Sequence, residues 1–266
     1  MDQQEWERSP LRLNLIEDSV KRAQAGVSKI IYLPQTGSTN QVSVDLLAEG
    51  NSEFAVVTDF QTAGKGRLNR IWEASPESSL LISLAFKLNA ITNLGWLNLW
   101  AATIARRVLM ENFNLEITLK WPNDLVVATP DAFLKFGGIL SEIHKEHVIF
   151  GIGINYSQDH SELPTSISTS IKLQNANFVA REFVIADLIS NLYKFWNLDA
   201  NSNQFPAKAI MREYQAASYT LGRRVVVTLP NGNEISGIAV ALAENGALMV
   251  RNEKGEIETI TAGDVN

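Results

Sequence analysis

Apolar positions along the chain fall into two patterns, short β-branched runs and longer apolar stretches, and these predict alternating strands and helices. The short runs favour strands because branched and aromatic side chains suit a pleated backbone. Expected strands cover residues 29–33, 54–60, 80–88, 117–120, 125–128, 136–144 and 147–155. The last two of these would form a tight hairpin through Lys145 and Glu146.

The longer apolar stretches predict helices, which cover residues 95–113, 181–196 and 207–217. Hydroxyl and amide side chains from Thr36 to Asn40 predict the cap of another helix, which ends near Gly50. Residues 1–30 are polar, and their leucines form no clear helical stripe. We therefore expect a short lead-in there, too short for a winged-helix DNA-binding domain.

The pattern changes after about residue 218, where short strands alternate with Asn-Gly and Lys-Gly turns. Four or five strands in so short a stretch predict a small β-barrel. The expected domains are a lead-in (1–30), a catalytic domain (31–217) and a C-terminal barrel (218–266). The fold class is α+β, with a central mixed or antiparallel sheet flanked by helices.

Composition narrows the function classes. The 266 residues are 45% apolar and 20% charged, as in ordinary globular proteins. A net charge of −6 argues against a general nucleic-acid binder. The absence of cysteine excludes disulfides, thiolate metal sites and a cysteine nucleophile, and it fits the cytoplasm. A polar N-terminus and the lack of a membrane-length apolar run favour no signal peptide and no membrane partner.

A glycine-spaced basic segment runs from Gln61 to Trp72 and carries Lys65, Arg67 and Arg70. Glycine lets a ligand approach the backbone, and the cations suit phosphate or carboxylate. The segment lacks the Gly-Lys-Ser/Thr order of a phosphate-binding P-loop and the Gly-x-Gly-x-x-Gly of a dinucleotide site. A solvated basic hairpin is the alternative. We expect the empty loop to be mobile, because its like charges repel.

Three further segments combine glycine with polar groups. Lys120-Trp121-Pro122-Asn123-Asp124 offers a cation, an amide and a carboxylate, although a packed turn would also explain it. In the segment 134–142, Gly137 and Gly138 are costly within a strand unless something approaches the backbone. Lys135 beside them is either an edge lysine or a cation aimed into a pocket. Gly151 and Gly153 would likewise clear room for a flat ligand.

These segments, in this order, resemble the biotin–protein ligases, and the resemblance spans residues 31–200. It implies a class II synthetase-like catalytic domain with a small Src-homology-3-like barrel. It also implies a two-step reaction with ATP and Mg²⁺: biotin becomes biotinyl-5′-AMP, and a lysine of a biotin carboxyl carrier domain then displaces AMP. The implied partners are biotin, ATP and the carrier domain of a carboxylase, without nucleic acid, and a homodimer is conceivable by analogy.

The resemblance also assigns residues. Lys135, Arg67 and Lys120 would act on the reacting groups. Biotin would contact Ser38, Thr39, Asn40, Gln61, Gly64, Lys65, Gly66, Arg67, Lys135, Gly138 and Gly153. ATP or the adenylate would contact Arg67, Arg70, Trp72, Lys120, Asn123, Asp124 and Asn155. No metal site made of protein groups alone is expected, and magnesium would arrive with ATP near Asp124.

Some positions depart from the family pattern. Lys65 stands where arginine is more usual, which keeps the charge but loses the bidentate fork. Leu68-Asn69 replaces a more basic, glycine-rich stretch, and Ser157 replaces a frequent asparagine. Two alternatives stay open: a lipoate–protein ligase of the same superfamily, and a non-catalytic biotin- or nucleotide-binding regulator.

Overall fold

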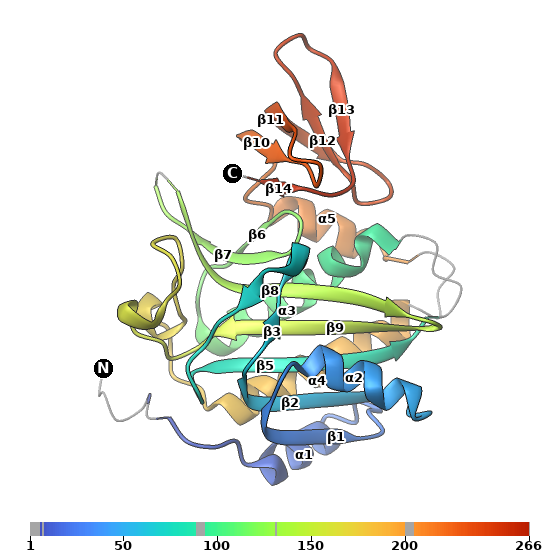
Figure 1. Ribbon diagram of the computed structural model, residues 1–266, viewed down its shortest axis with the longest axis vertical. Helices are drawn as coiled ribbons and strands as arrows, with labels where there is room; N and C mark the ends of the chain where they lie inside the picture. The colour runs from blue at the N-terminus through green and yellow to red at the C-terminus, as the bar shows by residue number, and fades with distance from the viewer. Residues whose placement is uncertain (1–5, 7, 89–93, 131, 200–204, 266) are drawn as a thin grey trace.

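The computed structural model describes residues 6, 8–88, 94–130, 132–199 and 205–265 (Figure 1). A large α+β body carries the chain up to about residue 217, and an all-β unit stands at one end of it. This arrangement confirms the predicted fold class. None of the described helices is long and apolar enough to cross a membrane.

The large body is built on a seven-stranded mixed sheet in the order β1-β2-β5-β9-β8-β7-β6. Its strands are β1 (Ile30–Thr36), β2 (Phe54–Gln61), β5 (Ser79–Lys87), β6 (Thr118–Lys120), β7 (Asp124–Ala128), β8 (Phe133–His144) and β9 (His147–Asn155). Only β1 and β2 run parallel, and the other neighbours are antiparallel. A two-stranded hairpin, β3 (Gly64–Lys65) with β4 (Ile71–Trp72), lies apart from this sheet.

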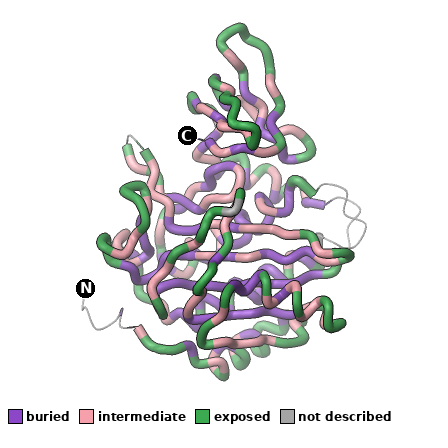
Figure 2. Tube along the Cα trace, in the orientation of Figure 1, coloured by how far each residue is buried: buried purple, intermediate pink, exposed green. Residues whose placement is uncertain are grey.

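Helices cover both faces of the sheet (Figure 1). They are α1 (Leu13–Arg22), α2 (Thr39–Ala48), α3 (Leu97–Phe113), α4 (Arg181–Asp199) and α5 (Lys208–Ala216). Strand periodicity divides the side chains between the faces. In β2, Phe54 and Val56 pack under α2, whereas Ala55 and Val57 join the larger core on the opposite face. Figure 2 shows the buried residues concentrated along the central strands.

No apolar helical stripe was expected in the segment that forms helix α1. Leu13, Ile16 and Val20 are spaced i, i+3, i+7, so they form one apolar face, and Ile16 and Val20 are buried. This face packs against α4 and shares the core of the large body. The expected lack of a helical stripe was wrong, because the apolar spacing continues beyond Ile16 to Val20. The domain boundary at residue 31 stays a prediction.

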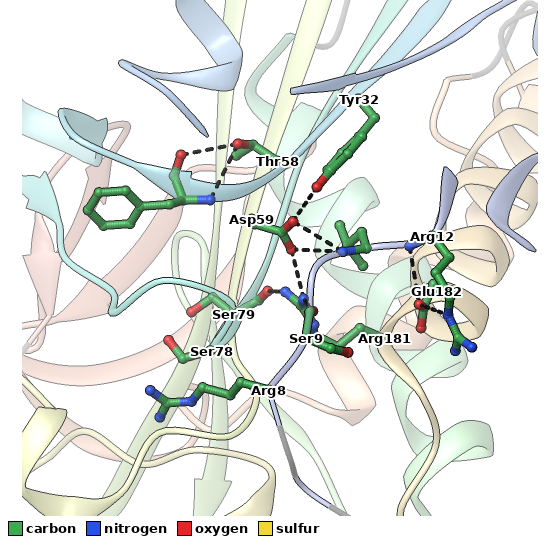
Figure 3. Close-up of polar contacts among 12 residues, drawn as sticks. Arg8, Ser9, Arg12, Tyr32, Thr58, Asp59, Ser78, Ser79, Arg181 and Glu182 are labelled. Atoms are coloured by element: carbon green, nitrogen blue, oxygen red, sulfur yellow. Dashed lines mark hydrogen bonds and ion pairs between the residues drawn. The ribbon is translucent and has the colours of Figure 1, made fainter. Parts of the chain in front are cut away.

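A buried ion pair fastens the segment before α1 to the sheet (Figure 3). Asp59 of β2 accepts hydrogen bonds from Arg181 at 2.7 Å, from the Tyr32 hydroxyl at 2.5 Å and from the Leu11 backbone N–H at 3.1 Å. Arg181 also donates to the carbonyl oxygens of Ser9 and Ser79. Both charges are therefore fully partnered, as burial requires. The network secures β2 two residues before Gln61.

The C-terminal unit is a five-stranded antiparallel sheet in the order β13-β12-β11-β10-β14. Its strands are β10 (Arg224–Thr228), β11 (Glu234–Leu242), β12 (Leu248–Arg251), β13 (Ile257–Ile260) and β14 (Asp264–Val265). Two tryptophan side chains of the large body donate hydrogen bonds to this unit. The indole N–H of Trp96 donates to Glu244 O at 2.9 Å, and that of Trp121 donates to Gly246 O at 3.2 Å.

Candidate active site

A cavity of about 470 Å³ lies where the β3–β4 hairpin, the ends of β8 and β9, the first turn of α2 and the C-terminal unit meet. Its walls include every residue that the sequence analysis assigned to biotin or ATP except Gly64. Parts of the Ser/Thr-rich segment after β9, namely Thr165, Ile167 and Ser168, line it as well. That segment was expected only to be a loop. It reaches the cavity because its backbone bonds to Lys135 on β8.

One end of the cavity is a cluster of neutral polar side chains around the start of α2. Gln61 Oε1 accepts the Thr39 backbone N–H at 2.8 Å and the Thr39 hydroxyl at 3.1 Å. This amide therefore satisfies the first turn of the helix. Ser38 occupies the N-cap position as predicted, but its side chain makes no capping hydrogen bond. Ser38, Thr39 and Asn40 are all buried. We call this cluster the amide end.

The glycines of the central strands accommodate an aromatic ring, and in this structure the ring is Trp72. A Cβ on Gly153 would lie 2.6 Å from the indole of Trp72, and one on Gly138 would lie 3.6 Å from it. Trp72 lines the cavity, and its expected contact with the nucleotide stays a prediction. Its indole N–H is buried and has no hydrogen-bond partner among the described residues.

The basic segment folds into a defined hairpin with a short turn of 3₁₀ helix, Arg67–Asn69. Leu68 takes a left-handed backbone conformation with φ 52°, which costs an L-residue about 1 kcal/mol or more. Glycine would adopt this conformation without strain, so the departure from a glycine-rich stretch has a local cost. Lys65 turns outward and donates to Gln41 on α2 at 2.9 Å. Mobility of this loop stays a prediction.

The other end of the cavity holds the cations, and two of them face one carboxylate. Lys135 on β8 pairs with Asp124 at 2.6 Å, while Lys120 lies 3.9 Å from the same side chain. Strand register brings them together, because Asp124 of β7 lies opposite Lys120 of β6 on one side and opposite Gly138 of β8 on the other. Burial lowers the pKa of Lys120 from its ordinary value, and the nearby Asp124 carboxylate opposes that shift.

Unexpectedly, three of these cations contact the last strand of the C-terminal unit. Lys120 donates to Val265 O at 2.5 Å, and Arg67 donates to Gly263 O at 3.2 Å. The carboxylate of Asp264 lies 3.6 Å from Arg67 and forms an ion pair with Arg70. Burial also lowers the pKa of Arg67, opposed by Asp264 and Asp124. We call this group of side chains the cation end: Arg67, Arg70, Lys120 and Lys135, with the carboxylates of Asp124 and Asp264.

Two of the predicted amides are engaged within the protein. Asn123 donates to Ile139 O at 2.8 Å and accepts from Arg67 at 3.4 Å, so it orients the arginine. Asn155 donates to Thr169 O at 3.0 Å and accepts from Gln158 at 3.2 Å, so it braces the cavity wall. No group of three or more acidic or histidine side chains that could hold a metal occurs in the described part of the chain.

The structure thus brings the predicted residues together around one hollow, and it adds residues that the sequence did not reveal. Ser83 lies beneath the amide end, bonded to Thr39 and Asn40. Glu142 accepts a hydrogen bond from the Asn40 side-chain amide. The sequence indicated only that Glu142 belongs to the glycine-containing segment 134–142. Gly263, Asp264 and Val265 join the cation end from almost 200 residues away in the chain.

Family comparisons agree with this geometry. Residues 32–159 match the model of the Biotin/lipoate A/B protein ligase family, and residues 220–266 match that of the Biotin protein ligase C terminal domain. Fold and cavity therefore define a ligase of the class that handles biotin or lipoate. The first match lies within the large body and includes all seven strands of its sheet except the start of β1, and the second covers the C-terminal unit.

Individual relatives narrow the family. The biotin–[acetyl-CoA-carboxylase] ligase of Mycobacterium tuberculosis is 28% identical over 97% of this chain and 96% of its own length. The bifunctional ligase/repressor BirA of Bacillus subtilis is 26% identical over 89% of this chain and 73% of its own. The Aquifex aeolicus biotin protein ligase in complex with biotin and ATP superposes with a TM-score of 0.71 at 29% identity, covering 90% and 98% of the two chains. This chain belongs to the biotin protein ligases.

Proposed function

We propose that this protein attaches biotin to a lysine of a biotin carboxyl carrier domain in two steps. First, a carboxylate oxygen of biotin attacks the α-phosphorus of ATP, and the bond to the β-phosphate oxygen breaks to release pyrophosphate. The lysine amine then attacks the acyl carbon of biotinyl-5′-AMP. The amide forms, AMP leaves with the bonding electrons of its acyl–oxygen bond, and the amine loses a proton to solvent.

The observation that carries this proposal is the shared cavity with its two unlike ends. Two anions must meet at phosphorus, so cations must offset their repulsion and the charge of the transition state. Lys135, Lys120 and Arg67 all line the cavity and are suited to that role. The amide end suits a neutral ring that needs both donors and acceptors. No covalent enzyme intermediate is needed, in keeping with a chain that has no cysteine.

In the proposed assignments, Lys135 contacts the biotin carboxylate and the reacting phosphate. Arg67 and Lys120 contact phosphate oxygens, and Gln61 with Thr39 contacts the ring of biotin. The β3–β4 hairpin closes over the adenylate and keeps water from it. Proteolysis between residues 64 and 70 tests whether ligands order the hairpin. Biotin with ATP should protect this segment, and equal cleavage with and without ligand would contradict closure.

The donor set fits magnesium only as a companion of the nucleotide. Mg²⁺ commonly uses one or two carboxylates, phosphate oxygens and retained waters. Asp124 lines the cavity, yet it is already paired with Lys135 at 2.6 Å. Asp124 would hold the ion indirectly, through its retained waters, and the ion would neutralise phosphate charge.

The proposal also includes a cytoplasmic location and a homodimer by analogy with relatives. Light scattering on the purified protein tests the homodimer.

The decisive test is mass spectrometry of a biotin carboxyl carrier domain incubated with this protein, biotin and ATP–magnesium. One biotinyl group should appear on one lysine, and pyrophosphate should be released before the carrier is added. Pyrophosphate release with biotin but not lipoate separates this function from a lipoate–protein ligase. A dithiolane ring would offer no hydrogen-bond partner to those polar atoms of the amide end that face the cavity, at about 1–3 kcal/mol for each buried group left unpaired. A non-catalytic binder would release no pyrophosphate.

A further inference from the structure

Behind the amide end lies a chain of hydrogen bonds that begins at a carboxylate outside the cavity. Glu142 of β8 accepts from the Asn40 side-chain amide, and the Ser83 hydroxyl lies 2.6 Å from both Asn40 Oδ1 and Thr39 Oγ1. Thr39 in turn donates its hydroxyl proton to Gln61 Oε1. Glu142 and Ser83 do not line the cavity, whereas Asn40, Thr39 and Gln61 do.

The carboxylate gives this chain a direction. An amide can present either its oxygen or its nitrogen, but an ionised carboxylate only accepts. The Asn40 nitrogen must therefore face Glu142, which leaves its oxygen toward Ser83. Ser83 has one proton, so it donates to Asn40 or to Thr39, and Thr39 remains free to donate to Gln61. Gln61 Oε1 also accepts the Thr39 backbone N–H, which can only donate, so Gln61 presents its nitrogen away from α2.

Packing also holds the Asn40 side chain tightly in place. Gly151 lies opposite Ser83 in the sheet, and a Cβ on Gly151 would come within 2.3 Å of the Asn40 oxygen. The Asn40 amide therefore rests directly on the backbone of β9. Ser83 is fully buried, and Thr39 and Asn40 are 3% exposed, so the middle of this chain of bonds is shielded from solvent. Glu142 is the one member of this group that carries a formal charge.

We propose that Glu142 is a positioning residue that fixes the orientation of Asn40 and, through Ser83 and Thr39, the acceptors that the amide end presents to the ligand ring. This inference rests on the proposed function and deepens it. The pattern presented by the cavity is an amide N–H from Gln61 beside hydroxyl oxygens that can accept. A cyclic urea, with one carbonyl between two N–H groups, complements that pattern. A ring without such groups does not.

The experiment compares wild type, Glu142→Gln, Glu142→Asp and the control Glu146→Gln. Glu142→Gln keeps the size of the side chain but lets the amide of Asn40 turn either way. Glu146 sits in the exposed turn of the same hairpin, so its substitution makes the same charge change away from the chain of bonds. Biotin affinity is measured by calorimetry, together with KM for biotin, KM for ATP, kcat and thermal stability.

Glu142→Gln should raise the Kd and KM for biotin about tenfold, the factor that 1.4 kcal/mol produces. KM for ATP, kcat and the melting temperature should stay near wild type, and Glu142→Asp should recover most of the affinity. The affinity for desthiobiotin, which keeps the urea but lacks the thioether ring, should fall in Glu142→Gln by the same factor as the affinity for biotin.

An unchanged biotin Kd in Glu142→Gln overturns the inference. So does a loss that extends equally to ATP, or one that Glu146→Gln reproduces, because each would indicate a general effect on folding or charge. If Glu142→Gln does not fold, the comparison of Glu142→Asp with wild type decides by the same criterion of biotin against ATP. Wild type that binds no biotin would contradict the proposed function instead.

Discussion

The amide end and the cation end of the cavity are built in opposite ways. At the amide end, neutral side chains from α2, β2 and β5 satisfy one another within the large body. At the cation end, charged side chains pair with Asp124 and with residues 263–265 of the C-terminal unit. The first region is complete within one unit, whereas the second needs both.

This difference suggests how each end responds to a ligand. The amide end is preformed, because its hydrogen bonds already fix the orientation of Gln61. The cations already have internal carboxylate partners, so phosphate groups must compete with Asp124 and Asp264 for them. Binding of a nucleotide should therefore rearrange the cation end, while the amide end should bind its ring with little change.

The largest effect is expected from Lys135→Ala. If Lys135 acts on charge that develops during adenylation, its loss should slow pyrophosphate release by about 10²–10³. Biotin affinity should change much less, because the amide end is intact. Lys172→Ala is the matched control, since Lys172 pairs with Asp159 at 2.9 Å and does not line the cavity. An adenylation rate within a few-fold of wild type would remove this role from Lys135.

Gly151→Ala should damage only the amide end. The new methyl group would meet the Asn40 oxygen at 2.3 Å, and overpacking of this kind costs about 1–3 kcal/mol. Titration calorimetry should show biotin bound about 10–100-fold more weakly, with KM for ATP nearly unchanged. Gly37→Ala is the control, because a Cβ there meets no atom within 4 Å. Equal weakening of biotin and ATP would show that the two ends are not independent.

Arg67→Gly should have a smaller effect, on retention of the adenylate. Arg67 contacts Asn123 of the large body and Gly263 and Asp264 of the C-terminal unit, so its loss removes contacts of the cation end with both units. Release of biotinyl-5′-AMP should accelerate about tenfold, as expected when one charged hydrogen bond is lost. Stopped-flow measurement of adenylate release tests this. Arg224→Gly, which removes an exposed arginine paired with Glu253, should leave release unchanged, and unchanged release in Arg67→Gly would refute the assignment.

The smallest expected effect is that of salt. Raising NaCl from about 0.05 M to about 0.5 M shortens the screening length several-fold. KM for ATP should rise about threefold, because the exposed part of the cation end loses attraction for phosphate. The Kd for biotin should stay within about twofold, since neutral hydrogen bonds are not screened. A biotin Kd that follows salt as steeply as the KM for ATP would erase the contrast between the ends.

Local sequence determined much of this molecule. Short runs of β-branched and other apolar residues predicted the strands of the central sheet, because such side chains suit a pleated backbone. The basic hairpin, the segment from Lys120 to Asp124 and the glycines of β8 and β9 were recognisable because each spans only a few residues. Charge and glycine at those spacings sufficed to predict a cavity for an acid and a nucleotide.

Only the tertiary structure decided which partners these residues take. Ser83 and Glu142 meet Asn40 because of strand register, and Asp264 meets Arg67 across almost 200 residues of chain. Trp72 covers Gly153 because the hairpin folds back over the sheet. A one-residue shift in pairing would turn each of these side chains to the other face. Register is set by the packing of the whole core, so no short segment of sequence contains it.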